Sequence, residues 1–283
     1  MKTVTTIAEI RALHAALAPG DTVGFVSTMG YLHPGHISLV EMARRENSVV
    51  AVSIFVNPTQ FGPNEDFSRY PREPERDLAM LGEAGVDWVF TPSVDEMYPQ
   101  GFSTYVDVRE ITQRLEGEMR PGHFLGVATV VAKLFNIVQP TRAYFGQKDA
   151  QQVVVLRKMV SDLAFPLHLV AAPTLREPDG LAMSSRNIYL AYDERQAALC
   201  LSGALHAVSA QWQAGERRGS VLREAMQAVL SAEPLARPDY VSVADPLTLE
   251  ELDDSGEAKE ALASLAVRIG KTRLIDNLLL GDA

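Results

Sequence analysis

The chain has 283 residues, 47% of them hydrophobic, and a formal net charge of −10, so it can bury a large core but disfavours a broad nucleic-acid-binding surface. Its single cysteine, Cys200, excludes an intramolecular disulfide, fits a cytoplasmic location and is expected to be a small buried residue. No uninterrupted apolar stretch is long enough to span a bilayer, so neither nucleic acid nor a membrane is an expected partner.

The first motif follows a predicted strand near the start of the chain. Residues 22–26 form a short β-rich run, apolar residues recur at helical spacing over 37–42, and residues 49–56 form a second β-rich run. This pattern predicts a strand, a loop, a helix and another strand. The loop and the first helical turn carry Thr28, Met29, Gly30, His33, Pro34, Gly35 and His36.

This loop is placed where α/β folds bind phosphate groups. The N-terminus of a helix offers unpaired backbone N–H groups, and glycines such as Gly30 and Gly35 let a phosphate approach the backbone. His33 and His36 are three residues apart and can point the same way, toward one phosphate. An ordinary turn and a zinc site are the alternatives. Zinc is disfavoured because the sequence has one cysteine and no His-Glu-x-x-His pattern.

Two further polar segments follow the second strand. Asn57 and Gln60 come where a parallel sheet opens its ligand crevice, and their amides can bind hydroxyl and carboxylate groups. Simple turn formation is the alternative, above all for Asn57, which precedes a proline. Arg120 and His123 precede the apolar stretch 127–138, which predicts a buried helix. Both are expected to be cationic groups that either bind an anion or cap and solvate the helix start.

A second strand-to-helix turn contains a lysine. Residues 143–145 predict a strand, and a helix that includes Gln152 is expected from about residue 151. Between them lie Gly146, Gln147, Lys148 and Asp149. Lys148 can neutralise phosphate oxygens, and Asp149 can orient that lysine or a hydrated Mg²⁺ ion. An exposed, solvated lysine is the alternative interpretation.

The next predicted strand covers residues 167–171, and a third polar segment follows it. It combines two hydroxyls with a guanidinium, in the order Met183, Ser184, Ser185 and Arg186. Such a set can hold triphosphate oxygens while pyrophosphate leaves. The alternative is an ordinary loop, since Ser-Ser-Arg is a common tripeptide.

The alternation of strands and helices predicts an α/β fold with a Rossmann-like, doubly wound parallel sheet. We place this domain at residues 1–175 and a smaller C-terminal α+β cap domain at residues 176–283. The second domain is expected to contain helices at 193–213 and 220–232 and strands at 240–243 and 265–269. The charged, proline-rich segment 64–76 is interpreted as an exposed flap over the site or as a solvated connector.

The motifs resemble known proteins at two levels. His-x-Gly-His after a first strand resembles the nucleotide signature of the adenylyl-transferring superfamily that includes class I aminoacyl-tRNA synthetases. All five ordered blocks together resemble the pantoate–β-alanine ligase family, densely over the first two thirds of the chain. The blocks are Thr28-Met29-Gly30 with His33-Pro34-Gly35-His36, Phe55-Val56-Asn57-Pro58 with Gln60-Phe61-Gly62, Arg120-Pro121-Gly122-His123-Phe124, Gly146 with Lys148-Asp149 and Gln151-Gln152, and Met183-Ser184-Ser185-Arg186-Asn187.

The final third matches this family mainly in length and in residues 269–277. Three residues depart from the family pattern, which usually has proline at Ser27, glutamate at Gln147 and tyrosine at Ala150. Serine in place of proline is expected to loosen the first phosphate loop, because it frees the backbone φ angle. None of the departures removes a group to which chemistry is assigned.

The resemblance implies an ATP-dependent ligase that joins pantoate to β-alanine through a pantoyl adenylate and releases AMP and pyrophosphate. It also implies Mg²⁺ as a cofactor and a homodimer as the assembly. The residues expected to be catalytic are His36, His33, Lys148 and Arg186. Those expected to bind ATP are Thr28, Met29, Gly30, His33, Gly35, His36, Gly146, Gln147, Lys148, Asp149, Leu175, Met183, Ser184, Ser185 and Arg186. Pantoate and β-alanine are expected to contact Gln60, Gln152, Asn57, Arg120 and His123.

Three other functions are open at this point. A nucleotidyltransferase of the same superfamily would share the histidine pair but accept a phosphate monoester, whereas Gln60 and Gln152 suit an uncharged polyol and a carboxylate better. A tRNA-charging enzyme would need an anticodon-reading domain, for which the chain is short and acidic. A non-catalytic nucleotide sensor would bind ATP without consuming it.

Overall fold

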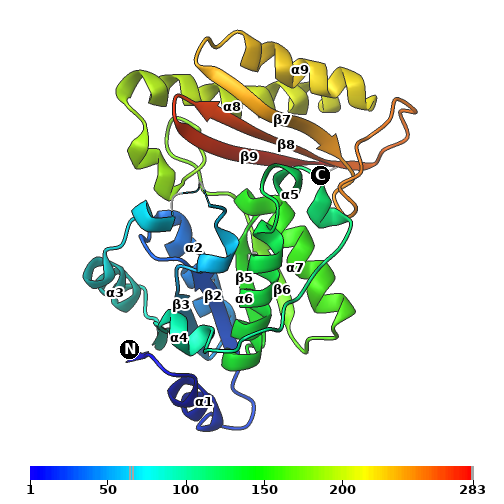
Figure 1. Ribbon diagram of the computed structural model, residues 1–283. Helices are drawn as coiled ribbons and strands as arrows, with labels where there is room; N and C mark the ends of the chain where they lie inside the picture. Colours follow the sequence, from blue (N-terminus) through cyan, green and yellow to red (C-terminus); the bar gives the residue numbers. More distant parts are fainter. Residues whose placement is uncertain (64, 66, 282–283) are drawn as a thin grey trace. The chain divides into compact units, whose positions relative to one another are not determined.

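The computed structural model describes residues 1–63, 65 and 67–281, which form two compact units (Figure 1). The first unit contains Met1–Gln147 and Val155–Pro173, and the second contains Lys148–Val154 and Thr174–Ala283. The domain boundary at residue 175 stays a prediction. The flap interpretation of segment 64–76 falls partly on residues 64 and 66, which lie outside the described residues.

The first unit is built on a six-stranded sheet in which every pair of neighbouring strands is parallel. The strand order is β1-β4-β3-β2-β5-β6. The strands are β1 (Lys2–Val4), β2 (Val23–Thr28), β3 (Val49–Ile54), β4 (Trp88–Phe90), β5 (Arg142–Gly146) and β6 (His168–Ala172). The predicted doubly wound parallel sheet is confirmed.

The order of the strands places a topological switch beside β2. The chain runs from β2 outward to β3 and β4, and then returns to form β5 on the other side of β2. In open parallel sheets, ligands bind beyond the carboxyl ends of strands at such a switch. The loop after β2 therefore lies at the expected edge of the sheet, and so does Gln147, directly after β5.

Helices flank this sheet. They are α1 (Ile7–Ala15), α2 (Pro34–Glu46), α3 (Pro74–Glu83), α4 (Val94–Met97), α5 (Glu116–Met119), α6 (His123–Val138) and α7 (Ala150–Asp162), with short 3₁₀ turns at η1 (Pro58–Gln60), η2 (Phe67–Arg69), η3 (Ile111–Gln113) and η4 (Gln147–Asp149). One core cluster joins Leu39 and Val40 of α2 and Leu81 of α3 to Val26 and Val52 of the sheet. The buried helix predicted at 127–138 is confirmed as part of α6.

The second unit is a three-stranded antiparallel sheet with two long helices. Its strands are β7 (Ala236–Ala244), β8 (Glu260–Ile269) and β9 (Thr272–Gly281), in that spatial order. Helices α8 (Tyr192–Gln213) and α9 (Gly219–Ser231) lie side by side along the sheet in Figure 1 and share its apolar core. A further 3₁₀ turn, η5 (Ser185–Tyr189), precedes α8. The expected α+β character is confirmed.

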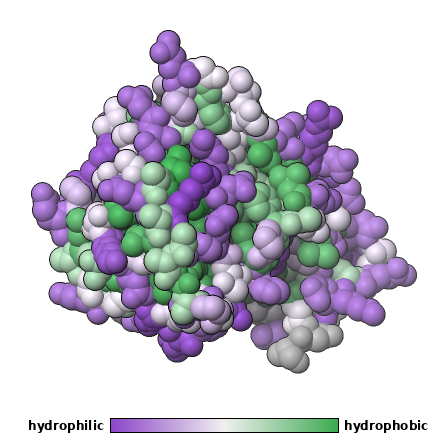
Figure 2. Space-filling view, turned by 90° about the horizontal axis from the view of Figure 1, so that it is seen from below, coloured by the Kyte–Doolittle hydropathy of each residue, from purple (hydrophilic) through white to green (hydrophobic). Residues whose placement is uncertain are grey.

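Polar and apolar groups are mixed on the surface. Figure 2 shows hydrophilic residues over much of one face, with hydrophobic residues between them. None of the helices in the described part of the chain is long and apolar enough to cross a bilayer. The single cysteine, Cys200 of α8, is partly buried against the core of the second unit. Its burial, with Glu233 nearby, raises the pKa of the thiol to about 11.

Candidate active site

The start of α2 fixes the two histidines of the first motif. His33 is the N-cap residue, Pro34 opens the helix, and the two imidazole centroids are 4.0 Å apart. The backbone N–H of Gly35 donates to His33 Nδ1 at 3.2 Å, and the backbone N–H of His33 donates to His36 Nδ1 at 3.3 Å. Because both Nδ1 atoms accept, each ring carries its proton on Nε2. An imidazole N–H is a kind of donor that phosphate oxygens accept.

A buried carboxylate shapes the loop before these histidines. Asp77 of α3 is 1% exposed and accepts hydrogen bonds from the backbone N–H groups of Tyr31, at 2.8 Å, and Leu32, at 2.7 Å. Gly30 has a φ of +81°, and a Cβ there would lie 3.0 Å from Asp77 Oδ2. Only glycine meets both conditions without strain. Thr28 is also buried, and its hydroxyl donates to the backbone oxygen of Ser53.

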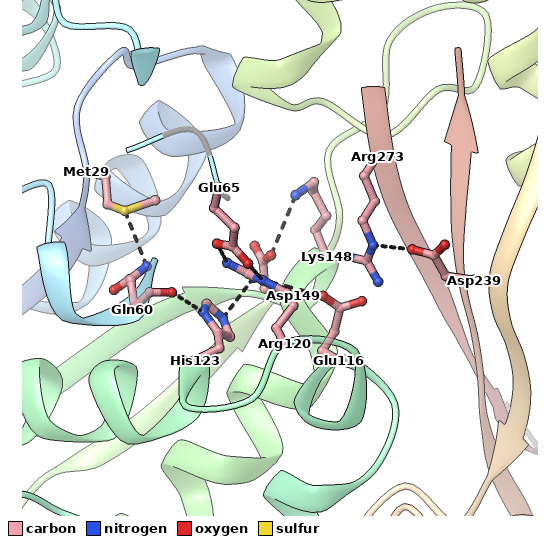
Figure 3. Close-up of polar contacts among 10 residues, drawn as sticks. All are labelled: Met29, Gln60, Glu65, Glu116, Arg120, His123, Lys148, Asp149, Asp239 and Arg273. Carbon is pink, nitrogen blue, oxygen red and sulfur yellow. Dashed lines mark hydrogen bonds and ion pairs between the residues drawn. The ribbon is translucent and has the colours of Figure 1, made fainter. Parts of the chain in front are cut away.

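Asn57 supports Gln60 from behind. The Asn57 side chain is 1% exposed, and its Oδ1 accepts from the hydroxyls of Tyr98, at 2.8 Å, and Thr59, at 2.9 Å. Its Nδ2 donates to Gln60 Oε1 at 3.0 Å and to the backbone oxygen of Gly126 at 3.2 Å. These bonds fix both amides, so Gln60 Nε2 is the donor end, which contacts Met29 Sδ at 3.3 Å (Figure 3).

His123, the first residue of α6, is neutral. Its Nδ1 lies 2.9 Å from the backbone oxygen of Gln60, and its Nε2 lies 3.1 Å from Arg120 Nη1, which can only donate. Burial, followed by the positive charge of Arg120, lowers the pKa of His123 to about 4. The expectation of a cationic His123 is therefore wrong, because desolvation and a neighbouring cation both oppose a second proton.

Arg120 is the positively charged member of the pair formed by Arg120 and His123, and it is bound to a carboxylate. Its Nε and Nη2 donate to the two oxygens of Glu65 at 2.7 and 2.6 Å, and Glu116 lies 4.0 Å away (Figure 3). Burial is the largest single influence and opposes ionisation of Glu65, but the hydrogen bonds and the positive charge of Arg120, with smaller effects, together outweigh it and hold the pKa of Glu65 below its ordinary value. A substrate carboxylate bound at this site would therefore compete with Glu65 for the N–H groups of Arg120.

The lysine turn lies where the sequence predicts, between β5 and α7. Lys148 Nζ is 3.6 Å from Asp149 Oδ1, and the Lys148 side chain is 20% exposed (Figure 3). Gln152 is partly buried in the first turn of α7.

Two of the three departures from the family pattern lie in regular structure. Ser27 lies within the β2 strand, opposite Ser53 of β3, rather than in the loop, and Ala150 is buried at the start of α7.

The Ser-Ser-Arg segment follows a small hairpin. The backbone N–H of Met183 donates to the oxygen of Leu175 at 3.0 Å, so these two residues pair across it. Ser184 caps η5 by accepting from the backbone N–H of Arg186, which leaves its own hydroxyl proton as the donor. Asn187 braces the segment through a 2.8 Å hydrogen bond to Glu177. Ser185 and Arg186 form the first turn of η5.

The described residues contain no group of three or more histidine, cysteine or acidic side chains that could hold a metal ion by itself. Asp149, about half exposed beside Lys148, is the acidic group of this turn. Mg²⁺ usually keeps several waters and binds substrate phosphates together with one or two carboxylates. The donor set fits that mode of binding rather than an all-protein cage.

Each unit thus brings its own predicted residues together. In the first, the sites after β2 and β3 converge around Met29 and Gln60, and His123 contacts the backbone of Gln60. In the second, Asn277 of β9 binds the backbone of Lys148, and η5, with its Ser-Ser-Arg residues, packs against the same strand. The sequence does not single out Asp77, Tyr98 or Glu65 in these roles, because each acts on a partner 41 to 55 residues away.

Comparison with known proteins gives a result for the whole chain. The family model described as pantoate-beta-alanine ligase matches residues 2–279. The chain belongs to the pantoate–β-alanine ligase family. A pantothenate synthetase of Chloroflexus aurantiacus is 63% identical over 280 residues, which cover 99% of this chain and 98% of the relative.

Solved members of the pantoate–β-alanine ligase family share the fold. The crystal structure of pantothenate synthetase from Thermus thermophilus superposes with a TM-score of 0.94 at 53% identity, with all of both chains covered. The ligase from Francisella tularensis, complexed with beta-gamma ATP and beta-alanine, gives 0.81 at 36% identity, with 100% of this chain and 99% of that chain covered. This family consists of ligases that form a C–N bond.

Proposed function

We propose that the protein condenses pantoate with β-alanine in an ATP-dependent reaction, through an enzyme-bound pantoyl adenylate, and releases AMP and pyrophosphate. The observation that carries this proposal is the pair of imidazoles at the start of α2, which lie 4.0 Å apart and each accept a backbone hydrogen bond at Nδ1. Membership of the pantoate–β-alanine ligase family supports the identity of the substrates.

In the first step, the pantoate carboxylate attacks the α-phosphorus of ATP. A carboxylate is already ionised at neutral pH, so this step needs in-line placement and neutralisation of charge rather than a strong base. His33 and His36 donate to the phosphates, and His36 stabilises the charge that develops on the leaving pyrophosphate. Lys148 and Arg186 supply positive charge, with the hydroxyls of Ser184 and Ser185 as further donors.

The remaining contacts proposed for ATP are made by residues that surround these groups. They are Thr28, Met29, Gly30, Gly35, Gly146, Gln147, Asp149, Leu175 and Met183. Among them, Thr28 acts through the loop, since its hydroxyl is already bound to Ser53. Asp149 is the residue that would contact hydrated Mg²⁺, which supplies charge neutralisation on the phosphates when bound.

Pantoate is held by the amides of Gln60 and Gln152. The hydrogen bonds that fix the Gln60 side chain direct its Nε2 as a donor, which suits a hydroxyl or carboxylate oxygen of this substrate. Asn57 is fully occupied by protein partners and therefore positions Gln60 without contacting the substrate.

In the second step, the amine of β-alanine attacks the acyl carbon of the adenylate and AMP leaves. The amine must be neutral to attack, and its pKa in solution is about 10, like that of a lysine. Arg120 binds the β-alanine carboxylate in exchange for part of its contact with Glu65. Neutral His123 places Arg120 by accepting from its Nη1.

Two further proposals concern the protein as a whole. We propose that it acts as a homodimer, as the family resemblance implies, and sedimentation equilibrium at micromolar concentration would give twice the monomer mass of 30.9 kDa. We also propose a cytoplasmic location, which its single cysteine supports. A monomer by sedimentation would contradict the first of these proposals.

Product analysis tests the proposed reaction. Incubation with ATP, Mg²⁺, pantoate and β-alanine should yield AMP, pyrophosphate and pantothenate in equal amounts. Omission of β-alanine should still give about one equivalent of pyrophosphate per enzyme, because the adenylate stays bound. Release of ADP, or no turnover, would reject the ligase mechanism, and no turnover with retained ATP binding would leave the nucleotide-sensor alternative.

A further inference from the structure

Strand β9 carries two adjacent polar residues that are almost completely buried. Asp276 is 2% exposed and Asn277 is 4% exposed, while the strand residues in the hydrophobic core cluster of this unit are aliphatic. Buried polar groups are costly unless hydrogen bonds satisfy them, and a buried charge needs a partner. A pair of this kind on one strand therefore points to specific partners, and we refer to Asp276 and Asn277 as the β9 clip.

Asn277 binds the backbone of the proposed phosphate-binding lysine. Its Nδ2 donates to the carbonyl oxygen of Lys148 at 2.8 Å, although the two residues are 129 positions apart. Lys148 Nζ contacts Asp149 at 3.6 Å, a contact of side chains that does not fix the backbone. The amide of Asn277 thus fixes the point from which the lysine side chain extends.

Asp276 binds the hairpin that leads to the Ser-Ser-Arg segment. Its two oxygens accept from Arg176 Nη1 at 2.6 Å and Nη2 at 3.0 Å, and Arg176 Nη1 also donates to the backbone oxygen of Gly180 at 3.1 Å. Arg176 pairs with Ala182 in a β-bridge. The Asp276 carboxylate also accepts from the backbone N–H of Asn277 at 2.8 Å, which fixes its orientation.

Successive residues of a strand point to opposite faces, which lets two neighbours on one strand hold two separate segments. We infer that the β9 clip is a pair of positioning residues that sets the spacing between Lys148 and the Ser184–Arg186 segment. This inference rests on the proposed function, in which both segments neutralise phosphate charge. It assigns a role in the reaction to the C-terminal strand, whose residues make no proposed contact with substrate.

We expect the β9 clip to affect the rate constant of the adenylation step. Adenylation depends on charges placed before the reaction begins, and a displacement of about 1 Å can lower a rate by about 100-fold. Loss of the Asn277 amide releases the Lys148 carbonyl without removing the lysine. We therefore expect the rate constant of adenylation in Asn277→Ala to fall by roughly 10- to 100-fold.

A single-turnover experiment separates positioning from mere destabilisation. Enzyme is mixed with saturating ATP, Mg²⁺ and pantoate without β-alanine, so that each folded molecule releases about one pyrophosphate, and this burst is followed. Positioning predicts a slower burst with unchanged amplitude in Asn277→Ala and in Asp276→Asn. A purely structural role predicts a smaller amplitude, from fewer folded molecules, at the wild-type rate, and that result would overturn the inference.

Ser242→Ala is the matched control for loss of a buried polar side chain. Ser242 lies in β7 of the same sheet, is 0% exposed, and its Oγ has no hydrogen-bond partner among the described residues. This variant should retain the wild-type rate and amplitude. If Ser242→Ala slows the burst as much as Asn277→Ala does, the clip has no special role and the inference fails.

A second substitution covers the case in which Asn277→Ala does not fold by circular dichroism. Asn277→Ser keeps a polar group in the buried position but shortens the side chain, so its reach to the Lys148 carbonyl is lost. A folded Asn277→Ser variant with a slow burst supports the inference, and one with a wild-type rate contradicts it. If wild-type enzyme itself gives no burst while nucleotide binds, the proposed function fails, which is distinct from a failure of the clip.

Discussion

The charge of a histidine in this protein depends on its surroundings more than on its residue type. His123 lies beside an arginine and is desolvated, so its pKa falls to about 4. His33 and His36 instead accept backbone hydrogen bonds at Nδ1 and present Nε2–H. The three imidazoles therefore differ in their hydrogen bonds: Nε2 of His123 accepts from Arg120, whereas Nδ1 of His33 and of His36 accepts from the backbone.

The His33 side chain caps α2 through Nδ1 and is proposed to donate from Nε2, and a substitution can separate these two functions. Asparagine is a strong N-cap, and its Oδ1 can accept from the Gly35 N–H, but it lacks a donor at the position of Nε2. His33→Asn should keep the unfolding free energy within about 0.5 kcal/mol of wild type and lower the adenylation rate at least about 10-fold. His33→Ala should also lose about 1 kcal/mol of stability. Urea unfolding and pyrophosphate release measure the two effects, and an unchanged rate in His33→Asn would remove the donor role.

A parallel substitution tests the transition-state role of His36. His36→Ala should lower the rate of adenylation much more than the affinity for ATP, because the ring is proposed to stabilise charge that develops only in the reaction. Equilibrium binding of nucleotide and single-turnover kinetics give the two quantities. Equal losses in both would show that His36 contributes ground-state binding alone.

His123 predicts a dependence of stability on pH. Its pKa is depressed in the folded protein relative to about 6.5 in the unfolded chain. Its contribution to stability is therefore fully present above pH 6.5 and is lost as the pH falls from 6.5 toward 4. His123→Asn keeps a donor near the Gln60 carbonyl without titrating in this range. The stability difference between wild type and this variant should shift by at most about 3 kcal/mol over that window in urea unfolding. A constant difference would contradict the prediction.

At the scale of elements, the contact between α6 and η1 sets the position of Gln60. A Cβ on Gly126 would lie 2.5 Å from the backbone oxygen of Thr59, so the helix can approach η1 closely only with glycine there. The same approach lets Asn57 reach the Gly126 carbonyl. Helix packing and the orientation of a proposed substrate-binding amide thus depend on one missing side chain.

Gly126→Ala should push η1 away from α6. We expect a loss of about 1–3 kcal/mol in unfolding free energy and a higher KM for pantoate with little change in KM for ATP. Gly82→Ala in α3 is the matched control, since its Cβ would meet only Met1 Cε at 3.8 Å and alanine favours helix by up to about 1 kcal/mol. Equal stability and kinetics in the two variants would show that the close approach is unimportant.

The sequence predicts an element when the residues of that element alone form a recognisable pattern. The apolar run at 127–138 and the glycines and histidines after β2 are of this kind, and the structure places α6 and α2 there. The strand predicted at 49–56 ends earlier, at Ile54, before the Asn57-capped turn. Short edge strands such as β1 do not emerge from the pattern, because three residues carry too little periodicity.

Much of the support for the candidate site escapes sequence reasoning for a different reason. The partners of Asp77, Glu65 and Asn277 are 45 to 129 residues away along the chain. The sequence around a carboxylate or amide in a helix or strand looks the same whether that side chain is solvated or is buried and hydrogen-bonded to a distant loop. The motif residues are therefore predictable, whereas the residues that orient them require the fold.

At the scale of the whole molecule, the one cysteine provides a probe of the second unit. Burial, with a contribution from Glu233, raises the pKa of the Cys200 thiol to about 11. At pH 8 the native protein should react with a disulfide reagent roughly 100-fold more slowly than a thiol of pKa about 9, and unfolding should restore the faster rate. Absorbance of the released aromatic thiolate measures this reaction. Rapid labelling of the native protein would show that this part of α8 opens readily.

The hydrogen bonds at the start of α2 tie the direction of the two imidazoles to the ring atoms that carry their protons. An imidazolium would attract phosphate more strongly than a neutral ring, yet a proton on Nδ1 would turn an acceptor into a donor and break the bond to the backbone. The backbone hydrogen bonds at this helix start thus favour an accepting Nδ1, so the helix itself fixes the direction of the two rings.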